Sequence, residues 1–382
     1  MRILLFCHSI ASCWNHGNAH FLRGLVRALM QQGHDVRTYE PADGWSRQNL
    51  AFYHGSAALT TFLRVYPELC CHTYHADHFD YDQALDGADL VLVHGWTDPR
   101  VVARLGEYRR RNRSLRLLFH ETHHRVVSAP GEMARYDLKH YDGVLAFGEV
   151  LTQHYLSRGL CERAWTFHEA ADTTVFSPPL RSVPKVGDLV WIGNWGDDER
   201  SDELEEFLLR PVERLRIDAQ VYGVRYPEHA SIRLRAAGIR YGGWLPNHQV
   251  ADAFHRFRMT VHVPRRYYRS SLPGIPTIRV FEALAAGIPL VCSPWSDTEG
   301  LFRGGRDYWT AENGAEMERC ISQLMQDDAA CKALSEAGRQ SIVERHTCAH
   351  RARELMAIYD EIAPSRAEET WQPASTVVAS GV

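Results

Sequence analysis

The chain has 382 residues, of which 45% are hydrophobic and 24% charged, with a formal net charge of −4. This balance is that of a globular protein and argues against a surface devoted to nucleic acid, although the arginine-rich stretch 108–116 leaves a nucleic-acid partner open. No apolar run approaches the ~18 residues that span a bilayer, and no secretory cleavage pattern follows Met1, so we expect a cytoplasmic protein. The length predicts two domains, and the oligomeric state stays undefined.

The first 177 residues alternate short apolar runs with stretches of helical periodicity. Gly33 is predicted to close the first helix, because glycine readily takes the positive φ found at helix ends. The apolar runs predict strands at 3–7, 88–93, 115–119 and 143–147, with helices near 22–29 and 100–110. Such alternation predicts a parallel sheet covered by helices, here an N-terminal Rossmann-like domain over residues 1–177.

A proline-rich stretch, 178–184, then predicts a linker. After it the alternation restarts, with strands predicted at 189–192, 220–222, 260–263 and 290–292, and helices at 202–215, 249–257, 277–286, 312–326 and 329–345. We expect a second Rossmann-like domain over 186–345, a C-terminal helix over 346–362 that packs back toward the N-terminal domain, and a flexible tail over 363–382. Ligands bind outside the carboxyl ends of strands in such sheets, so two domains of this kind would face one another across a cleft.

A His-Glu-x-x-His string occupies residues 120–124. In zinc hydrolases this string lies on a helix, where two histidines four residues apart reach one metal. Here it follows the apolar run 115–119 directly, which places it in a strand-to-helix loop instead. We therefore expect no metal, and we expect His120 and Glu121 to point into the cleft as catalytic groups that donate or accept protons. The alternative is that they are ordinary surface residues.

The stretch 275–290 carries the strongest pattern of the second half. Pro276 suits the first turn of a helix and Gly287 its end. The helix start offers unpaired N–H groups near Thr277, which suit a diphosphate. Arg279 and Glu282 lie one turn apart on one side of this helix. With a diphosphate at the helix start, Glu282 would be placed to accept hydrogen bonds from the ribose of the nucleotide.

Residues 282–289 match the Glu-Ala-x-Ala-x-Gly-x-Pro stretch that binds the donor ribose in glycosyltransferases of the GT-B fold, which this chain resembles. Residues 33–36, 119–121 and 168–176 resemble further motifs of the retaining, family-4-like members, in the same order along the chain. Residues 200–211 and 278–283 resemble the spore-maturation, CgeB-type subgroup. Retaining members have a glutamate eight positions before Glu282, where this chain has Gly274, so the resemblance does not define retention or inversion.

The resemblance implies transfer of a sugar from a nucleotide-diphosphate sugar, by default a UDP-sugar, to a hydroxyl acceptor of undefined class, with no metal and no cofactor. The departing diphosphate needs cationic and hydrogen-bonding groups. Candidates after the strands of the second domain are Asn194, Arg200, Arg265 and Arg266. Arg200 could instead form surface ion pairs with its acidic neighbours.

In the first domain, Gly17 and Asn18 open the first helix, where a glycine lets backbone approach a sugar or acceptor. Two other functions fit the same fold. A sugar-nucleotide epimerase would use the same donor site, and a non-catalytic nucleotide-sugar-binding protein would retain the pocket without turnover.

Overall fold

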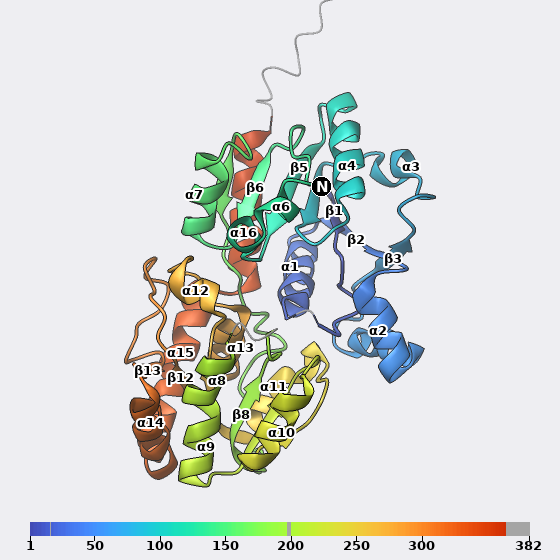
Figure 1. The fold of residues 1–382 in the computed structure, drawn as a ribbon. Helices are drawn as coiled ribbons and strands as arrows, with labels where there is room; N and C mark the ends of the chain where they lie inside the picture. Colours follow the sequence, from blue (N-terminus) through green and yellow to red (C-terminus); the bar gives the residue numbers. More distant parts are fainter. Residues whose placement is uncertain (16, 197–199, 364–382) are drawn as a thin grey trace, which may run out of the picture.

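The computed structural model describes residues 1–15, 17–196 and 200–363. Two parallel sheets form two α/β domains, drawn one above the other in Figure 1. The seven-stranded N-terminal sheet has the order β3-β2-β1-β4-β5-β6-β7, and the six-stranded C-terminal sheet has the order β10-β9-β8-β11-β12-β13. The predicted pair of Rossmann-like sheets is therefore confirmed.

The strands alternate with helices along the chain. The N-terminal strands are β1 Arg2–Phe6, β2 Asp35–Pro41, β3 Cys71–Tyr74, β4 Leu90–His94, β5 Arg116–Glu121, β6 Gly143–Ala146 and β7 Ala164–Thr166. The C-terminal strands are β8 Gly187–Ile192, β9 Ala219–Tyr222, β10 Arg240–Tyr241, β11 Phe257–His262, β12 Leu290–Cys292 and β13 Trp309–Thr310. The N-terminal helices are α1 Ala19–Gln31, α2 Trp45–His54, α3 Tyr81–Leu85, α4 Pro99–Arg111, α5 Arg125–Ser128, α6 Pro130–Met133 and α7 Glu149–Ser157, with 3₁₀ turns at Ser56–Leu59 and Thr61–Arg64.

The C-terminal domain has a similar alternation. Its helices are α8 Ser201–Leu204, α9 Arg210–Leu215, α10 Glu228–Ala236, α11 Val250–His255, α12 Arg266–Ser270, α13 Ile278–Ala286, α14 Gly314–Gln326, α15 Asp328–Arg345 and α16 Cys348–Ile362, with a 3₁₀ turn at Asn247–Gln249. A π-helical turn, Glu205–Leu209, joins α8 to α9 just before Pro211, where the ring of proline would disturb a regular helix. No described helix combines the length and apolar character that crossing a membrane requires.

The central strands are buried on both faces, as parallel sheets between helices require. All five residues of β4 and all six of β5 are buried.

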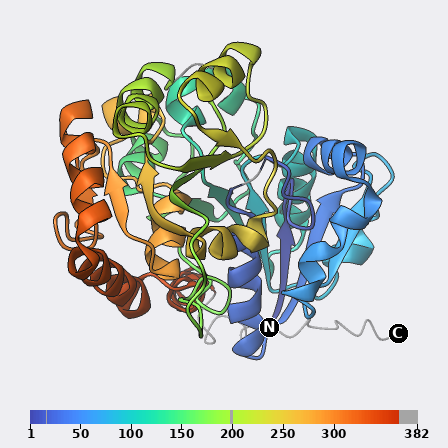
Figure 2. The same ribbon diagram turned by 90° about the horizontal axis from the view of Figure 1, so that it is seen from below.

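Gly33 takes a φ of +86° directly after α1, which confirms its predicted role at that helix end. Figure 2 shows the first hundred residues, in blue, on the opposite side of the molecule from α14 and α15. The two domains thus have separate sheets, each with its own covering helices.

The chain crosses between the domains twice, and the two crossings are bonded together. The first crossing includes Ala171 and the second leads from α15 into α16. The N–H of Ala171 donates to the carbonyl of His346 at 3.0 Å, and the N–H of Cys348 donates to the carbonyl of Ala171 at 3.0 Å. At the far end of α16, Arg116 Nε donates to the carbonyl of Ile362 at 2.8 Å. Helix α16 therefore packs on the N-terminal domain, as predicted; the tail expected beyond it lies, from residue 364, outside the described residues.

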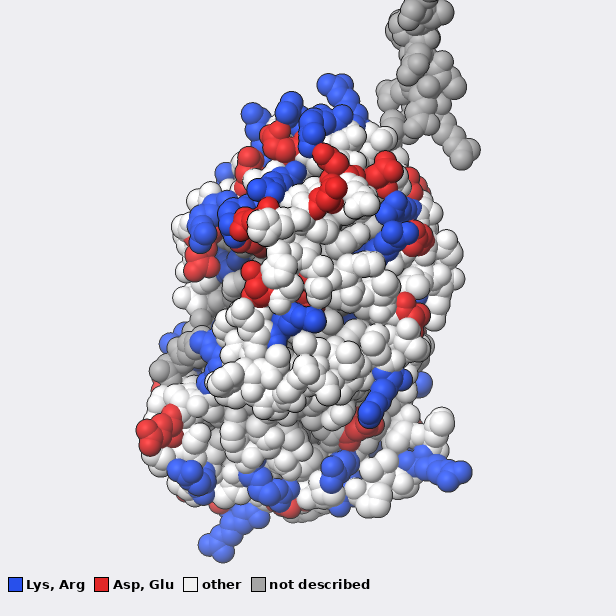
Figure 3. Space-filling view, turned by 90° about the vertical axis from the view of Figure 1, so that its right-hand side faces the viewer, with Lys and Arg blue, Asp and Glu red and all other residues white. Residues whose placement is uncertain are grey.

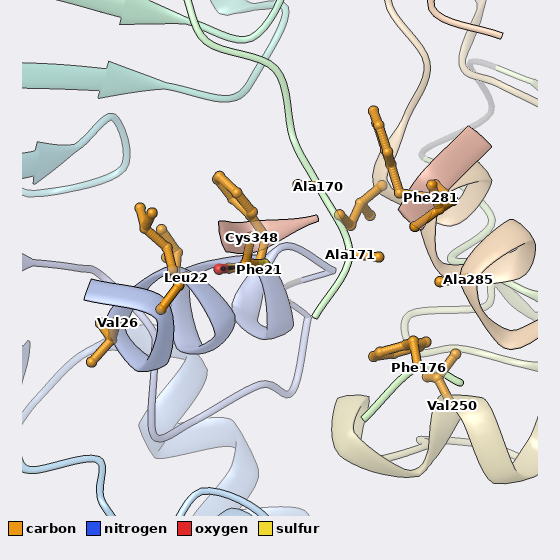
Figure 4. Close-up of a cluster of buried hydrophobic side chains, with 14 of the residues drawn as sticks. Phe21, Leu22, Val26, Ala170, Ala171, Phe176, Val250, Phe281, Ala285 and Cys348 are labelled. Carbon is orange, nitrogen blue, oxygen red and sulfur yellow. Dashed lines mark hydrogen bonds between the residues drawn. The ribbon is translucent and has the colours of Figure 1, made fainter. Parts of the chain in front are cut away.

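A continuous apolar cluster fills the junction around these crossings. Figure 4 shows side chains from α1, the first crossing, α11, α13 and α16 gathered at this place. Gly24 of α1 lies at its tightest point. A Cβ added to Gly24 would lie 2.6 Å from both Asp172 Cβ and Cys348 Sγ, so only glycine lets α1 approach the two crossings this closely.

We predict that Gly24→Ala destabilises the protein by about 1–3 kcal/mol, because the added methyl group overpacks the junction by more than the higher helix propensity of alanine offsets. Urea unfolding followed by circular dichroism measures the change. Gly131→Ala is the control, since a Cβ at that glycine meets no atom within 4 Å. Equal stability of the two variants would contradict the close packing at Gly24.

Candidate active site

A cavity of about 1190 Å³ lies between the two domains. Its walls include residues that follow β1 and β4 in the N-terminal sheet and β8 and β11 in the C-terminal sheet. Within each sheet these two strands are neighbours, and the strand order reverses between them. Ligands of doubly wound sheets bind at this reversal, outside the carboxyl ends of the strands. The cavity joins two such positions and is the candidate active site.

His120 and Glu121 do not line this cavity, which corrects the prediction that their side chains point into the cleft. Strand β5 continues two residues beyond the predicted end, and pairing with β4 and β6 buries both side chains. His120 is 2% exposed, lies edge-on to Phe21 and Phe167, and burial lowers its pKa to about 4. The string 120–124 therefore begins at a strand end and does not place its two histidines on one helical face.

Glu121 holds other residues in position. Its carboxylate lies 3.3 Å from Arg125 Nη2 and accepts a hydrogen bond from the Tyr155 hydroxyl at 3.3 Å. Burial raises the pKa of Glu121, and the nearby Arg125 opposes that rise. The guanidinium of Arg125 lies 4.0 Å from the centre of the Trp96 ring. Glu121 thus holds Arg125 in place, and Arg125 in turn packs on the ring of Trp96, which lines the cavity.

The following residues of the string reach the cavity instead. His123 and His124 both line it. His124 is 3% exposed, its Nδ1 lies 2.7 Å from Ser128 Oγ, and its Nε2 has no hydrogen-bond partner among the described residues. Burial first, then Arg265 and Arg125, lower its pKa to about 4, so the imidazole is neutral at pH 7. A buried polar atom of this kind at a cavity wall suits a bound ligand.

The opposite wall contains the start of α13, as predicted. Thr277 precedes the helix, and its hydroxyl lies 2.9 Å from His262 Nε2. Burial, with a smaller effect of Arg200, lowers the pKa of His262 to about 3. His262 Nδ1 and Asn247 Oδ1 are buried without partners among the described residues, and both side chains line the cavity. This wall thus presents unsatisfied polar atoms beside a helix start that favours anions.

Three of the four predicted arginines reach the cavity and one does not. Arg200, Arg265 and Arg279 line it. Arg200 donates to the carbonyls of Asn194 and Val263, the latter at 2.9 Å. Arg266 is a correction: it is absent from the cavity wall and pairs with Glu203 at 3.0 Å on the exposed side of α12. The turn into α12 sends the two adjacent arginines in different directions.

Glu282 is fully buried and does not line the cavity, although its partners do. Its carboxylate pairs with Arg279, accepts a hydrogen bond from Asn247 Nδ2 at 3.2 Å and lies 2.7 Å from Nδ1 of His20 in α1. Burial would raise the pKa of Glu282, but Arg279 and His20 together hold it below its ordinary value. The predicted direct contact with ribose is thus not available in this conformation; Glu282 orients Arg279 and Asn247 instead.

The loop before α1 forms part of the floor. Gly17 and Asn18 line the cavity, as expected. A Cβ on Gly17 would lie 3.3 Å from Ile278 Cγ2, so the close approach is to the start of α13. Across the cleft, Asn194 donates to Asn15 and accepts from the N–H of Val224 at 2.8 Å. Small and amide side chains thus bring the two domains together.

Several lining residues escaped sequence reasoning. They include His262, Asn247 and Arg225 on the C-terminal wall, and His124, as a residue of the cavity wall, on the N-terminal side. His262 ends β11, so the rule on strand ends could have found it. Asn247 begins a short 3₁₀ turn and Arg225 lies in a loop, and no sequence pattern indicated that either would reach the cavity. Among the described residues, no group of three or more His, Cys, Asp or Glu could hold a metal ion.

Comparisons with known proteins agree with this architecture. A family model described as "Glycosyl transferase-like" matches residues 200–357. By sequence, no curated protein matches the chain. An α-glucosyltransferase in complex with UDP has 13% identity and a TM-score of 0.67, with 94% of this chain and 100% of that chain covered. An Anabaena protein, Alr3699/HepE, in complex with UDP and glucose has 12% identity, a TM-score of 0.67 and the same coverage.

A third structure, phage T4 BGT in complex with UDP and Mn²⁺, has 13% identity and a TM-score of 0.61, with 95% of this chain and 100% of that chain covered. At these identities the similarity defines the fold. The chain therefore has the two-domain GT-B fold of glycosyltransferases, as its sequence indicated. The family match lies mainly on the C-terminal domain, whose residues Arg200, Arg265 and Arg279 line the cavity.

We predict that His262→Gln makes stability less sensitive to acid. The folded pKa of about 3 lies below the unfolded value of about 6.5, so the unfolded state binds the extra proton between these values and stability falls as pH falls. Removing the histidine should flatten the plot of unfolding free energy against pH between 6.5 and 4 by up to about 1.4 kcal/mol per pH unit. Urea titrations across this range measure the slope.

Proposed function

We propose that the protein transfers a sugar from a UDP-sugar to an acceptor hydroxyl in the interdomain cavity. The observation that carries this proposal is the composition of the C-terminal wall. Among the described residues that line it, this wall has four arginines, Arg200, Arg225, Arg265 and Arg279, and no carboxylate. Four cations on a wall that also contains the start of α13 suit a diphosphate, and the structural neighbours that contain UDP support uridine as the base.

The chemistry follows from this charge. The acceptor oxygen forms a bond to the anomeric carbon, the bond from that carbon to the diphosphate breaks, UDP leaves with the electron pair and the hydroxyl proton is released to water. Negative charge grows on the diphosphate as the bond breaks. Arg265 and the start of α13 would stabilise this charge, because preorganised donors in a cleft need no reorientation during the reaction.

Buried groups on the same wall would bind the nucleoside. Asn247 Oδ1 and His262 Nδ1 offer unsatisfied polar atoms to ribose hydroxyls or to the base. Glu282 would act through Arg279 and Asn247, or would contact ribose after His20 moves away. The resemblance of residues 200–211 to the CgeB-type subgroup supports membership there. Because Gly274 stands where retaining members have a glutamate, the sequence does not define retention or inversion. NMR of the anomeric proton of the product would distinguish the two.

We predict that Arg265→Ala lowers turnover of UDP-sugar about 100-fold, the typical effect of removing one preorganised donor to a developing anion. Release of UDP in a coupled assay measures turnover. Arg266→Ala is a matched control from the adjacent position, and it should retain nearly full activity because Arg266 pairs with Glu203 outside the cavity. Equal loss in both variants, or loss in neither, would remove Arg265 from the diphosphate site.

We further propose that the arginines neutralise the diphosphate without a metal ion. Turnover by protein treated with EDTA and then dialysed should equal that of untreated protein, because the cations of the wall are covalently part of the chain. A loss of activity that Mn²⁺ restores would contradict this proposal and would agree instead with the Mn²⁺ found in the phage T4 neighbour. Arg265→Ala should stay unresponsive to Mn²⁺.

A further inference from the structure

The two walls of the cavity carry opposite charge. Among the described lining residues, the N-terminal wall has two arginines, Arg100 and Arg125, and four carboxylates, those of Asp43, Asp77, Asp98 and Glu132. The charged residues described on the C-terminal wall are all arginines. Arg100, one of the two, already pairs with Asp77 at 3.2 Å and with Asp98 at 2.9 Å. Figure 3 shows one face of the molecule on which charged side chains gather toward the two ends and few lie across the middle. The excess of carboxylates on the N-terminal wall therefore repels polyanions.

Two exposed tryptophans lie on the same acidic wall. Trp45 is 50% exposed and Trp96 is 40% exposed, and both line the cavity. Each is held by neighbours: Trp45 lies edge-on to Trp14 with ring centres 5.0 Å apart, and Trp96 is supported by Arg125. Guanidinium groups lie over both rings, Arg225 at 5.9 Å from the centre of Trp45 and Arg125 at 4.0 Å from that of Trp96. The indole surface that stays exposed suits the flat, apolar C–H face of a sugar ring, because burying both removes apolar area from water.

A buried, unsatisfied histidine provides an independent indication of a ligand on this wall. His124 is nearly inaccessible and lines the cavity, and its Nε2 has no partner among the described residues. Its Nδ1 bonds to Ser128, so the free nitrogen offers one directional hydrogen bond. A hydroxyl group can serve as donor or acceptor to such an atom, whichever tautomer is present.

We propose that the acceptor is an uncharged saccharide that lies on the N-terminal wall. Its ring faces stack on Trp96 and Trp45, its hydroxyls donate to the carboxylates of Asp43 and Asp77, and one hydroxyl bonds to His124. Nucleic acid and phosphorylated or uronic acceptors are disfavoured, because like charges in a cleft repel and the wall has no surplus of cations. This inference rests on the proposed transferase function and adds the chemical class of the second substrate.

The test is a binding experiment on the full chain saturated with UDP. Maltose, cellobiose and chitobiose serve as neutral probes, with their 6-phosphates and a 12-base-pair DNA duplex as anionic probes, at 0.15 M salt. Calorimetry should give at least one neutral disaccharide a Kd tenfold or more below that of its phosphate, and no measurable DNA binding. Tighter binding of a phosphate or of DNA, or no binding of any neutral disaccharide, would overturn the inference. Absence of UDP binding would instead overturn the proposed function.

Variants assign the effect to the wall. Trp96→Ala should raise the Kd for the best disaccharide at least tenfold and leave the Kd for UDP unchanged; Phe52→Ala, at an exposed aromatic residue outside the cavity, should change neither. The double variant Asp43→Lys/Asp77→Lys should bind the 6-phosphate more tightly than the wild-type protein does. Glu336→Lys/Glu344→Lys, at two exposed positions of α15, is the control with the same change in net charge. An unchanged preference in the double variant would show that the carboxylates do not select the acceptor.

Discussion

The arrangement of the cavity depends on one buried carboxylate at the domain junction. Glu282 loses all contact with water, which is costly for a charged group unless partners replace that water. Arg279, Asn247 and His20 supply these partners, from the same helix, from a neighbouring loop and from the other domain. These contacts link Glu282 to Arg279 within α13 and to His20 of α1, so the carboxylate contributes both to the direction of Arg279 and to the approach of α1 to α13.

The walls that converge there divide the chemistry between the domains. Strand ends of the C-terminal sheet carry arginines, a helix start and unsatisfied polar atoms, all of which favour an anion. Strand ends of the N-terminal sheet carry carboxylates, indoles and neutral imidazoles. A donor with a negative leaving group and an acceptor without charge would therefore each meet the wall that suits it. Charge would then direct the donor to its wall, and stacking and hydrogen bonds would hold the acceptor on the other.

The sequence predicted the sheets better than the side-chain directions. Long apolar periods at 88–93 and 277–286 located buried elements, because burial itself produces the pattern. The direction of His120 was predicted wrongly because the strand was expected to end at residue 119, whereas it continues to Glu121. Polar residues after an apolar run have the same sequence pattern whether they belong to the strand or to the loop that follows it. Arg265 and Arg266 could not be separated because the turn into α12 is local backbone geometry. Asn247 and Arg225 reach the cavity only through tertiary packing of loops, which no local pattern encodes.

The hydrogen bonds between Ala171 and residues 346–348 join the two interdomain crossings into a single short connection. Two independent linkers would let one domain twist and slide against the other. A joined pair restricts such movements, so any change in the angle between the domains would displace atoms near Ala171 less than atoms far from it. Under the proposed function, a change in the angle between the domains would widen the rim that lies far from Ala171, whereas the four arginines would keep their mutual geometry because they all belong to one domain.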